Sequence, residues 1–529
     1  MNAAENVRVR IAPSPTGAMH LGLVRTALFN WLFVRGQGGK FILRIDDTDA
    51  QRNQAEVVRP ILEGLRWLGI DWDEGPEVGG AYEPYFQSER SRWHAEAVER
   101  LLHTGHAYWD YATPEEIDAE RKQAIESKQG VFRYSRRWMA EGPGERHRFE
   151  AQGRRAVVRL KMPSAGRLEL DDIVRGRVEF EWLREQDHVI QRQDGTVLYH
   201  LASAVDDAQM RISHVIRAEE HLSNTPRQVF ILQALGYPMP RFAHLPFVAE
   251  PGSRNKLSKR KLAQYLRNRD FAELVEHGRR LLDRVGVGPE EVPNPVTVDF
   301  YREAGFLPEA LVNYLALLGW ALDDHSELFS REELVAAFSL ERVNRSPASF
   351  DPLKLMAIEV RHMLALPVEE RVRLTRPWLV RAGLVLRPVA PQVERTLSAV
   401  VEAAGDRIKV TGDILDYAGF FTSDDALEYD RAAFEKRLRA PGATDLLRRF
   451  RDRLVSVEPF TAPVLEDLLA RFVAEEEVKV GAVIHALRVA LTGKPVGFGM
   501  FETMAILGRE SCLARIERAL VRAESTEER

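Results

Sequence analysis

The link between the first expected strand and the helix after it carries residues suited to binding a phosphate group. It reads Ser14-Pro15-Thr16-Gly17-Ala18-Met19-His20-Leu21-Gly22. In an open parallel sheet such a link lies at the carboxyl ends of the strands, where ligands bind. The N-terminus of the helix also offers free N–H groups and a partial positive charge to an anion. His20 can donate to a phosphate oxygen, and Gly22 allows a flat ring to approach the backbone. Alone, a histidine near a helix start is more often a cap or a surface residue.

A second candidate for phosphate chemistry is the basic run Lys256-Leu257-Ser258-Lys259-Arg260, in a polar loop after the last expected strand. Two lysines that flank a serine can neutralise a triphosphate while charge builds on a leaving pyrophosphate. The usual phosphate-binding loops, GxxxxGK[ST] and GxGxxG, do not occur in the sequence. If this run stood alone, a basic loop without a catalytic role would be the better interpretation.

Two strand–helix–strand units must position these residues. The first has a strand at 7–11, a helix at 21–35 closed by Gly36, Gly38 and Gly39, and a strand at 41–45. The second has a strand at 214–217, a helix to about 236 with Thr225 as N-cap and Pro226 at its first position, and a strand at 242–248. Short links between such elements predict a parallel sheet with right-handed crossovers. Between the units, residues 107–199 read as an inserted mixture of turns, strands and helices.

After about residue 300 strand signals nearly vanish and helical patterns dominate. One example is Val480, Val483, Ile484, Leu487 and Leu491, which repeat at helical spacing and end at Gly493. The fold class expected from these patterns is α/β. It combines a Rossmann-type nucleotide-binding domain, an inserted α+β domain and an all-helical C-terminal half.

Size and composition set the outer limits. A chain of 529 residues is expected to form three to five domains, and 45% hydrophobic and 29% charged residues are ordinary for a globular protein. No stretch approaches the eighteen or so apolar residues that span a bilayer, and the first six residues do not resemble a signal peptide. The lone Cys512 excludes an internal disulfide and is expected to be buried in a C-terminal helix. These features predict a cytoplasmic protein with no membrane partner.

The net charge of −5 does not decide for or against a nucleic-acid partner, because a partner responds to local patches. Two basic clusters occur, and a solvated helix face is the more frequent explanation for such a cluster. One cluster lies at 256–261; the other comprises Arg437, Arg439, Arg448, Arg449, Arg451 and Arg453.

Taken together and in this order, the motifs resemble the class I aminoacyl-tRNA synthetases, with HLG and KLSKR in the places of the HIGH and KMSKS signatures. More narrowly, the chain resembles the glutamyl-tRNA synthetases over about its first 350 residues. The matching segments are RIAPSPTG (10–17), TALFNWLF (26–33), RIDDTD (44–49), PYFQSER (84–90), VDDAQMRISHVIRAEEHLSNTPRQ (205–228), KLSKRK and GFLPEALVNYLALLGW (305–320). The remainder matches in its helical character and in HALRVALTG (485–493).

The resemblance implies that L-glutamate is activated with ATP and Mg²⁺ and transferred to tRNA(Glu), or also to tRNA(Gln). It implies no zinc. The oligomeric state is open, with a monomer as the default expectation. Glutamate would be held by Arg10, Ser14, Asp46, Tyr199 and Arg217, with Asp46 facing the α-ammonium group and an arginine fork matching the side-chain carboxylate. ATP would be bound by His20, Gly22, Lys256, Ser258 and Lys259, and the catalytic residues would be His20, Gly22, Lys256 and Lys259.

The same resemblance implies a division of the chain. Residues 1–106 and 201–260 would form the two halves of the catalytic domain, the second carrying the KLSKR loop. Residues 107–200 would bind the acceptor stem, and 261–355 would contact the tRNA stem. Residues 356–440 and 441–529 would form two parts of a helical anticodon-binding domain.

Several positions depart from the family pattern. The largest departure is an insertion at about 262–298, for which a solvated helical hairpin is the favoured interpretation and tRNA contact the alternative. The single-residue departures are Leu23 at the end of the HIGH position, Ser203 in place of asparagine, Asp110 and Ala112 in place of zinc-binding cysteines, and Ala357, Glu359 and His362.

Three other functions are compatible with some of these motifs. A glutaminyl-type ligase is expected to carry a β-barrel C-terminal half, which disagrees with the helical pattern here. A non-catalytic tRNA-binding relative is disfavoured because the histidine, glycine and lysines of both motifs are intact. A truncated relative that modifies a tRNA base would lack the helical half. The sequence leaves open whether tRNA(Gln) is also charged and whether tRNA must bind before glutamate is activated.

Overall fold

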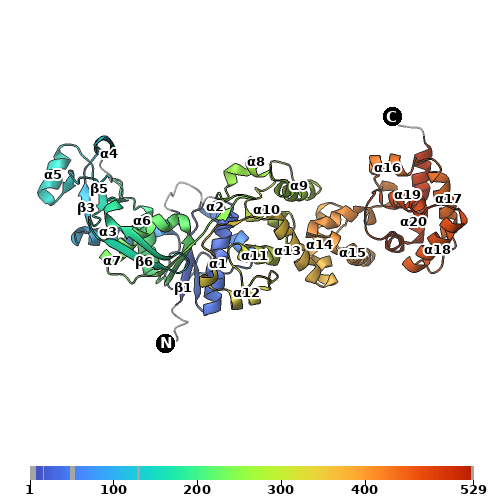
Figure 1. The fold of residues 1–529 in the computed structure, drawn as a ribbon, viewed down its shortest axis with the longest axis horizontal. Helices are drawn as coiled ribbons and strands as arrows, with labels where there is room; N and C mark the ends of the chain where they lie inside the picture. Colours follow the sequence, from blue (N-terminus) through green and yellow to red (C-terminus); the bar gives the residue numbers. More distant parts are fainter. Residues whose placement is uncertain (1–6, 16, 48–53, 128–131, 526–529) are drawn as a thin grey trace. The chain divides into compact units, whose positions relative to one another are not determined.

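The computed structural model describes residues 7–15, 17–47, 54–127 and 132–525 (Figure 1). Parts of the motif predictions and of the signal-peptide prediction fall outside the described residues. They rest on Thr16, Thr48, Asp49 and the six N-terminal residues. The chain divides into two compact units. Unit 1 holds the residues up to Ala272 together with Pro293–Arg302 and Pro308–Leu355, and unit 2 holds Glu273–Val292, Glu303–Leu307 and the residues from Met356 onward.

Unit 1 contains two parallel strand pairs, as the two strand–helix–strand units predicted. Strand β1 (Arg8–Ile11) pairs with β2 (Lys40–Leu43), and β9 (His214–Ala218) pairs with β10 (Arg241–Leu245). Ser213, just before β9, donates its N–H to the carbonyl of Arg8 at 2.9 Å, so β1 and β9 lie side by side. Their carboxyl ends, at Ile11 and Ala218, therefore reach the same edge.

Helix α1 (Leu21–Gln37) is buried on nearly all its faces because it lies between these strands and helices α11 (Pro308–Leu317) and α12 (Arg331–Ala337). It ends as predicted at the glycines: Gly38 is the C-cap, with φ of 65°. At Gly39 a β-carbon would lie 2.1 Å from the carbonyl oxygen of Val7, so only glycine allows the chain to pass this close to β1.

The segment between the two strand–helix–strand units folds around a four-stranded antiparallel sheet in the order β4-β3-β5-β8. These strands are β3 (Ala107–Asp110), β4 (Met139–Ala140), β5 (Val157–Leu160) and β8 (Val189–Gln191). Its apolar side chains share one core with α3 (Ser91–His103), α6 (Tyr199–Gln209) and α7 (Thr225–Ala234). The inserted segment is therefore packed against the rest of unit 1.

A hairpin of β6 (Arg167–Asp172) and β7 (Gly176–Glu181) belongs to the same stretch of sequence but docks on β10. The N–H of Ile173, in the hairpin turn, donates to the carbonyl of Phe242 at 2.9 Å. The predictions from sequence did not place this hairpin beside the parallel strands.

The remaining elements of the first 355 residues are short helices and one small strand pair. The strands are β11 (Val248–Ala249) and β12 (Ala348–Ser349), which pair in parallel. The helices are α2 (Gln54–Trp67), α4 (Pro114–Glu126), α5 (Pro143–Ala151), α8 (Leu262–Tyr265), α10 (Val298–Glu303) and α13 (Pro352–Ala365), the last of which continues into unit 2.

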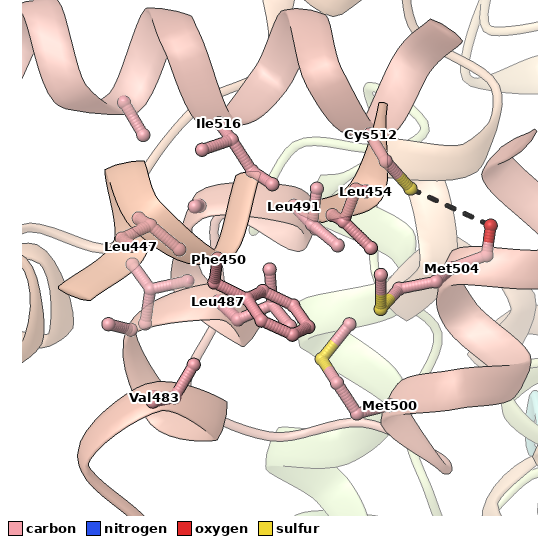
Figure 2. Packing of buried hydrophobic residues seen from close by; sticks show 14 of the residues in the cluster. Leu447, Phe450, Leu454, Val483, Leu487, Leu491, Met500, Met504, Cys512 and Ile516 are labelled. Atoms are coloured by element: carbon pink, nitrogen blue, oxygen red, sulfur yellow. Dashed lines mark hydrogen bonds between the residues drawn. The ribbon is translucent and has the colours of Figure 1, made fainter. Parts of the chain in front are cut away.

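Unit 2 is helical, and among the described residues no strand follows Ser349. Its helices beyond α13 are α14 (Val368–Arg381), α15 (Pro391–Ala404), α16 (Arg431–Arg437), α17 (Ala443–Leu454), α18 (Ala462–Glu475), α19 (Val480–Thr492) and α20 (Met500–Glu524). Figure 2 shows their core, in which Leu447, Phe450, Leu487 and Ile516 interdigitate. Cys512 lies in this core on α20, as expected, and its thiol faces the carbonyl of Met504 at 3.6 Å.

The inserted stretch at about 262–298 is not a solvated hairpin. Its main element, α9 (Arg269–Asp283), buries Val275, Leu281 and Leu282 among other apolar residues. In unit 2 its polar side chains pair with the 3-10 segment Thr411–Phe420: His277 Nε2 lies 2.6 Å from Asp413 Oδ1. The helix is amphipathic, so its apolar face requires a packing partner and is buried rather than solvated.

The start of α7 also differs from the expectation. Asn224, not Thr225, is the N-cap, and Thr225 is the first residue of the helix. The hydroxyl of Thr225 is fully buried and turns toward the side chain of Arg217. A tertiary partner therefore replaces the local capping bond that the sequence suggested.

Candidate active site

A cavity of about 300 Å³ opens at the carboxyl ends of β1 and β9 in unit 1. Its wall includes the end of β1, the link that follows it, the start of α1, the end of β9 and part of the basic loop. Eight of the predicted site residues line it: Arg10, Ser14, His20, Gly22, Asp46, Tyr199, Arg217 and Lys256. Two sequence motifs more than 200 residues apart thus face one space.

Arg217, near the end of β9, is a buried cation at this cavity whose hydrogen-bonding partners are neutral. Its side chain donates to His244 Nε2 at 3.1 Å, to Gln228 Oε1 at 2.6 Å and to Thr225 Oγ1 at 2.9 Å. Among the described residues no carboxylate forms an ion pair with it. Burial lowers the pKa of Arg217 to about 10, which still leaves it charged at neutral pH. A buried guanidinium at a cavity wall that has no ion-pair partner is suited to bind an anion, above all a carboxylate.

The hydroxyl of Tyr199, at the start of α6, lies on the same wall, 3.4 Å from Nδ1 of His221. Burial, with the charge of Arg217, lowers the pKa of His221 to about 4. His221 is therefore neutral at physiological pH. This part of the cavity combines one cation with neutral polar groups.

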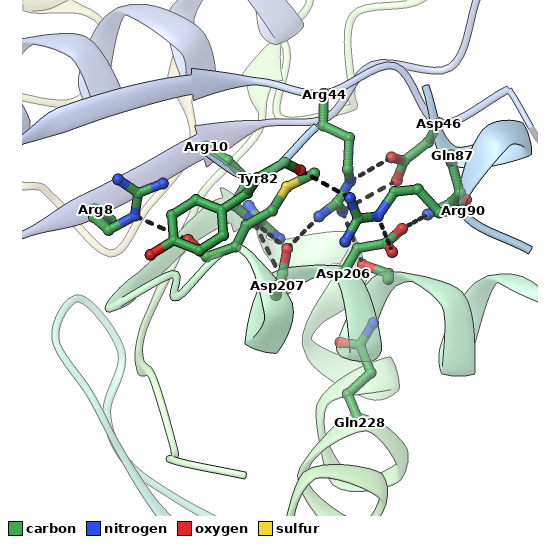
Figure 3. A network of polar contacts seen from close by, with 12 residues as sticks. Arg8, Arg10, Arg44, Asp46, Tyr82, Gln87, Arg90, Asp206, Asp207 and Gln228 are labelled. Carbon is green, nitrogen blue, oxygen red and sulfur yellow. Dashed lines mark hydrogen bonds and ion pairs between the residues drawn. The ribbon is translucent and has the colours of Figure 1, made fainter. Parts of the chain in front are cut away.

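Arg10, on β1, is held differently. Its Nε lies 3.0 Å from Oδ1 of Asp207, a buried residue of α6. Figure 3 shows that Asp207 also accepts from Arg44, whose Nη1 lies 2.7 Å away. Asp207 thus fixes two arginines, while the terminal nitrogens of Arg10 have no partner among the described residues.

Asp46 lines the cavity but is not a free carboxylate. Its Oδ1 accepts from Nε of Arg44 at 2.8 Å, and both side chains are buried. Burial raises the pKa of Asp46, although the neighbouring arginine opposes this effect. An ammonium group that binds here must share the carboxylate with Arg44, which the sequence did not predict.

His20 is both the N-cap of α1 and part of the cavity wall. Its Nδ1 accepts from the N–H of Leu23 at 3.1 Å, so the capping role left open by the sequence is real. Burial, with the charges of Lys256 and Lys259, lowers the pKa of His20 to about 4, so the ring is neutral at pH 7. Nε2 then carries the proton and can donate into the cavity. A β-carbon at Gly22 would lie 3.2 Å from this ring.

The two lysines of the basic loop differ in their position relative to the cavity. The ammonium group of Lys256 lines the cavity and forms an ion pair with Glu220. The ammonium group of Lys259 lies beside the cavity and donates to the carbonyl of Ala18, a residue of the wall. Ser258 does not line the cavity, and its N–H donates to the hydroxyl of Tyr265 at 2.9 Å.

Several residues of the site were missed by the sequence analysis. Glu220 and His221 lie in a segment that carried the family resemblance, but no role was given to them. Asp207 lies in the same segment and contacts Arg10 and Arg44, whereas His244 lies outside the matching segments and contacts Arg217. Arg25, on α1, is a further buried cation at the wall, and its Nη1 donates to the carbonyl of Leu318 at 2.9 Å.

The described residues contain no group of three or more histidine, cysteine, aspartate or glutamate side chains arranged to hold a metal ion. Asp110, at one of the positions noted for zinc, is buried and pairs with Nε of Arg159 at 2.5 Å. No helix in the described part of the chain is long and apolar enough to cross a membrane.

Unit 2 has a second, smaller cavity of about 30 Å³. Aromatic rings and charged groups line it, among them Tyr417, Phe420, Phe498, the cations Arg488 and Lys494, and the carboxylate Asp416. The rings of Phe420 and Phe498 are stacked, with centroids 5.4 Å apart. Rings beside cations at a surface cavity are suited to contact a nucleobase.

The positive charge of the arginine-rich helix α17 is largely neutralised by neighbouring carboxylates. Four of its arginines pair with carboxylates of unit 2; for example, Nη2 of Arg453 lies 2.6 Å from Glu475. The other pairs are Arg448–Glu524, Arg449–Glu476 and Arg451–Glu517. This charge balance favours the solvated-face interpretation of the cluster.

Comparison with known families and proteins agrees with this geometry. The family model described as "tRNA synthetases class I (E and Q), catalytic domain" matches residues 6–294 and 292–357, and the "Anticodon binding domain" model matches residues 370–520. The chain is 42% identical to a glutamate–tRNA ligase of Desulforudis audaxviator over 98% of its length and 96% of the relative. It is also 42% identical to glutamate–tRNA ligase 2 of Rubrobacter xylanophilus, over 100% and 99% of the two chains.

The structure agrees as well. It superposes on a glutamate tRNA ligase from Elizabethkingia meningosepticum in complex with its amino acid with a TM-score of 0.82 and 30% identity, covering 98% of this chain and 99% of the other. The matches extend over both units, and the cavity lies at the carboxyl ends of parallel strands with both motifs beside it. The chain belongs to the class I aminoacyl-tRNA synthetases, in the glutamate–tRNA ligase family.

Proposed function

We propose that the chain joins L-glutamate to the 3′-terminal adenosine of tRNA(Glu) in an ATP-dependent reaction through a glutamyl-adenylate. The observation that carries this proposal is Arg217, a buried cation with neutral partners at the cavity that also contains His20 and Lys256. It is suited to the side-chain carboxylate of glutamate, since an anionic ligand compensates a charge that the protein leaves uncompensated. Arg10 and Tyr199 complete the same wall.

In the first step the α-carboxylate of glutamate attacks the α-phosphorus of ATP and pyrophosphate leaves with the electron pair of the broken P–O bond. Neutral His20 donates a hydrogen bond to a phosphate oxygen. Lys256 and Lys259 stabilise the negative charge that develops on the leaving group. Because Lys256 is paired with Glu220 in this structure, we propose that the triphosphate takes over its ammonium group.

In the second step a ribose hydroxyl of the terminal adenosine attacks the carbonyl carbon of the adenylate. The ester bond forms, AMP leaves, and the hydroxyl proton is transferred to the departing phosphate or to water. No side chain of the protein becomes covalently attached. We propose that residues 107–200 bind the acceptor stem that delivers this adenosine, in line with the family resemblance.

The test is aminoacylation of total tRNA with labelled L-glutamate or L-glutamine, followed by sequencing of the charged tRNAs. Glutamate on tRNA(Glu) alone is the expected result. Glutamate on tRNA(Gln) as well would show relaxed tRNA selection by the same chemistry. Charging with glutamine, or no charging with either amino acid, would contradict the proposal.

We further propose that unit 2 reads the anticodon at its small aromatic and cationic cavity. Arg488→Gln should weaken tRNA binding several-fold and reduce its salt dependence, because one cation near the nucleic acid is removed. Arg453→Gln is the matched control, since Arg453 is an exposed arginine of the same unit that is neutralised by Glu475. Filter binding across a salt series measures both. Equal effects of the two substitutions would contradict the assignment of the cavity.

A further inference from the structure

Behind Arg217 lies a buried chain of polar contacts that ends in the β6–β7 hairpin. Nε of Arg217 lies 3.1 Å from Nε2 of His244, and Nδ1 of His244 lies 2.6 Å from Oδ2 of Asp172. The side chains of His244 and Asp172 are fully buried and do not line the cavity. His244 also stacks on Phe242, with ring centroids 6.0 Å apart. From the interior outward, the chain of contacts therefore runs from the carboxylate of Asp172 through the imidazole of His244 to the guanidinium of Arg217 at the cavity.

The proton on the imidazole can be assigned from Asp172 on one side and Arg217 on the other; the hydroxyl of Thr225 also lies 3.2 Å from Nε2. Asp172 accepts from the backbone N–H groups of His244 at 3.2 Å, Val174 at 3.0 Å and Arg175 at 2.8 Å, which are partners of an ionised carboxylate. Nδ1 of His244 must then carry the proton that faces Asp172. Nε2 is left with a lone pair and accepts from Arg217, a donor that has no accepting capacity of its own.

The pKa values agree with this assignment. Burial lowers the pKa of His244, although the hydrogen bond to Asp172 opposes it, so the ring is neutral at physiological pH. Burial would raise the pKa of Asp172, but hydrogen bonds from His244 and the N–H of Arg175 hold it below its ordinary value.

We propose that Asp172 and His244 are positioning residues for substrate recognition: they fix the orientation of Arg217 for the side-chain carboxylate of glutamate while leaving its positive charge available. This inference rests on the proposed function. The physical reason is the neutral imidazole between the two charges. If Asp172 bonded directly to Arg217, it would orient the guanidinium but also neutralise it, and the substrate carboxylate would have to compete. An imidazole transmits orientation without supplying a counter-charge.

The position of Asp172 adds a structural consequence. The residue lies at the turn of a hairpin from the inserted stretch of sequence, and that turn is fastened to β10 by the Ile173–Phe242 backbone bond. Asp172 thus supports the amino-acid pocket from the inserted stretch without lining the cavity itself.

Two substitutions of His244 separate its two contacts. In His244→Asn the amide N–H lies where Nδ1–H was and keeps Asp172 paired, but Arg217 loses one of its three acceptors, the one that receives from Nε. In His244→Gln the longer side chain places an amide oxygen near the Nε2 position, where it can accept from Arg217. We expect His244→Asn to raise the KM for glutamate and the Kd of L-glutamate about tenfold, the loss expected for one hydrogen bond to a charged group.

The KM for ATP and the kcat at saturating glutamate should stay within about twofold of the parent values, because the substitution leaves His20, Lys256 and Lys259 unchanged. His244→Gln should recover most of the loss. Asp172→Asn should raise the KM for glutamate in the same direction, whereas Asp171→Asn, on the exposed face of the same strand, should leave it unchanged.

The measurements are steady-state aminoacylation with the full chain and calorimetric titration of L-glutamate. A merely structural role would lower the unfolding temperature, or change all kinetic constants together, without the selective loss of glutamate affinity; either result overturns the positioning role. If the parent chain binds and transfers glutamate and His244→Asn leaves the glutamate KM unchanged, only this inference fails. If the parent chain binds no glutamate, the proposed function and this inference fail together.

Discussion

At the scale of single residues, the site is defined by which charges are compensated. Arg10 and Arg44 share Asp207, and Asp46 is paired with Arg44. Arg217 has neutral partners instead, so it is the group with most to gain from an anionic ligand. The sequence alone does not reveal this difference, because all three residues are arginines, and burial does not distinguish them either.

Arg217→Gln should raise the KM for glutamate by about 30-fold or more, the loss expected when one partner of a buried charge pair is removed. The KM for ATP should change little. Steady-state aminoacylation measures both constants, and Arg241→Gln, an exposed arginine on β10, serves as the control. An unchanged glutamate KM would remove Arg217 from the pocket.

Lys259→Ala should slow glutamyl-adenylate formation about 100-fold, as expected when a charge contact to the transition state is lost. Binding of ATP should weaken less than the rate falls. Pyrophosphate exchange in the presence of tRNA measures the step. The neighbouring Arg260→Ala is the control, because that side chain is exposed. Near-normal exchange in Lys259→Ala would contradict the role given to the loop.

At the scale of elements, one residue at the start of helix α1 has both a structural and a chemical role. His20 caps the helix through Nδ1 and leaves Nε2 for the cavity. A helix N-terminus is a favourable place for a phosphate, so the same position satisfies an unpaired backbone N–H and presents a donor.

The two roles of His20 can be separated by substitution. Asparagine is a good N-cap, so His20→Asn should keep the stability of the parent, whereas His20→Ala should lose about 1 kcal/mol. Both should weaken ATP binding and slow adenylate formation, since both remove the imidazole. Urea unfolding and pyrophosphate exchange give the two readouts. Full activity in His20→Asn would show that the ring serves only as a cap.

At the scale of the whole molecule, unit 1 buries several histidines in neutral form. Burial lowers the pKa values of His20, His188, His200 and His221 to about 4. In the unfolded chain the same groups have a pKa near 6.5, so below that pH the unfolded state binds more protons than the folded state.

The contribution of these histidines to the free energy of unfolding should therefore be largest above about pH 6.5 and decline as the pH falls toward about 4. Calorimetric unfolding of the intact chain between pH 7.5 and 4.5 measures this as a falling Tm. His188→Gln removes one such group outside the cavity, and its Tm should fall less steeply with pH. A Tm that stays constant between pH 6.5 and 4.5 would contradict the prediction.

The sequence alone determined the parts that depend on local patterning. Hydrophobic periodicity and the glycines at 36–39 located α1 and its end, and the second strand–helix–strand unit appeared within a few residues of its predicted position. The helical character of the C-terminal half and the burial of Cys512 followed in the same way. The two motifs, in their order, also brought His20 and Lys256 to one cavity, because the carboxyl ends of parallel strands share one edge.

Only the tertiary structure decided what depends on contacts between distant segments. It placed the β6–β7 hairpin on β10, buried the apolar face of α9, and turned Thr225 from a cap into a partner of Arg217. It also showed that Asp46 and the arginines of α17 are already paired. Charge compensation and burial are properties of neighbours in space, so residue types and spacing predicted which groups could act but not which of them remain free to bind a ligand.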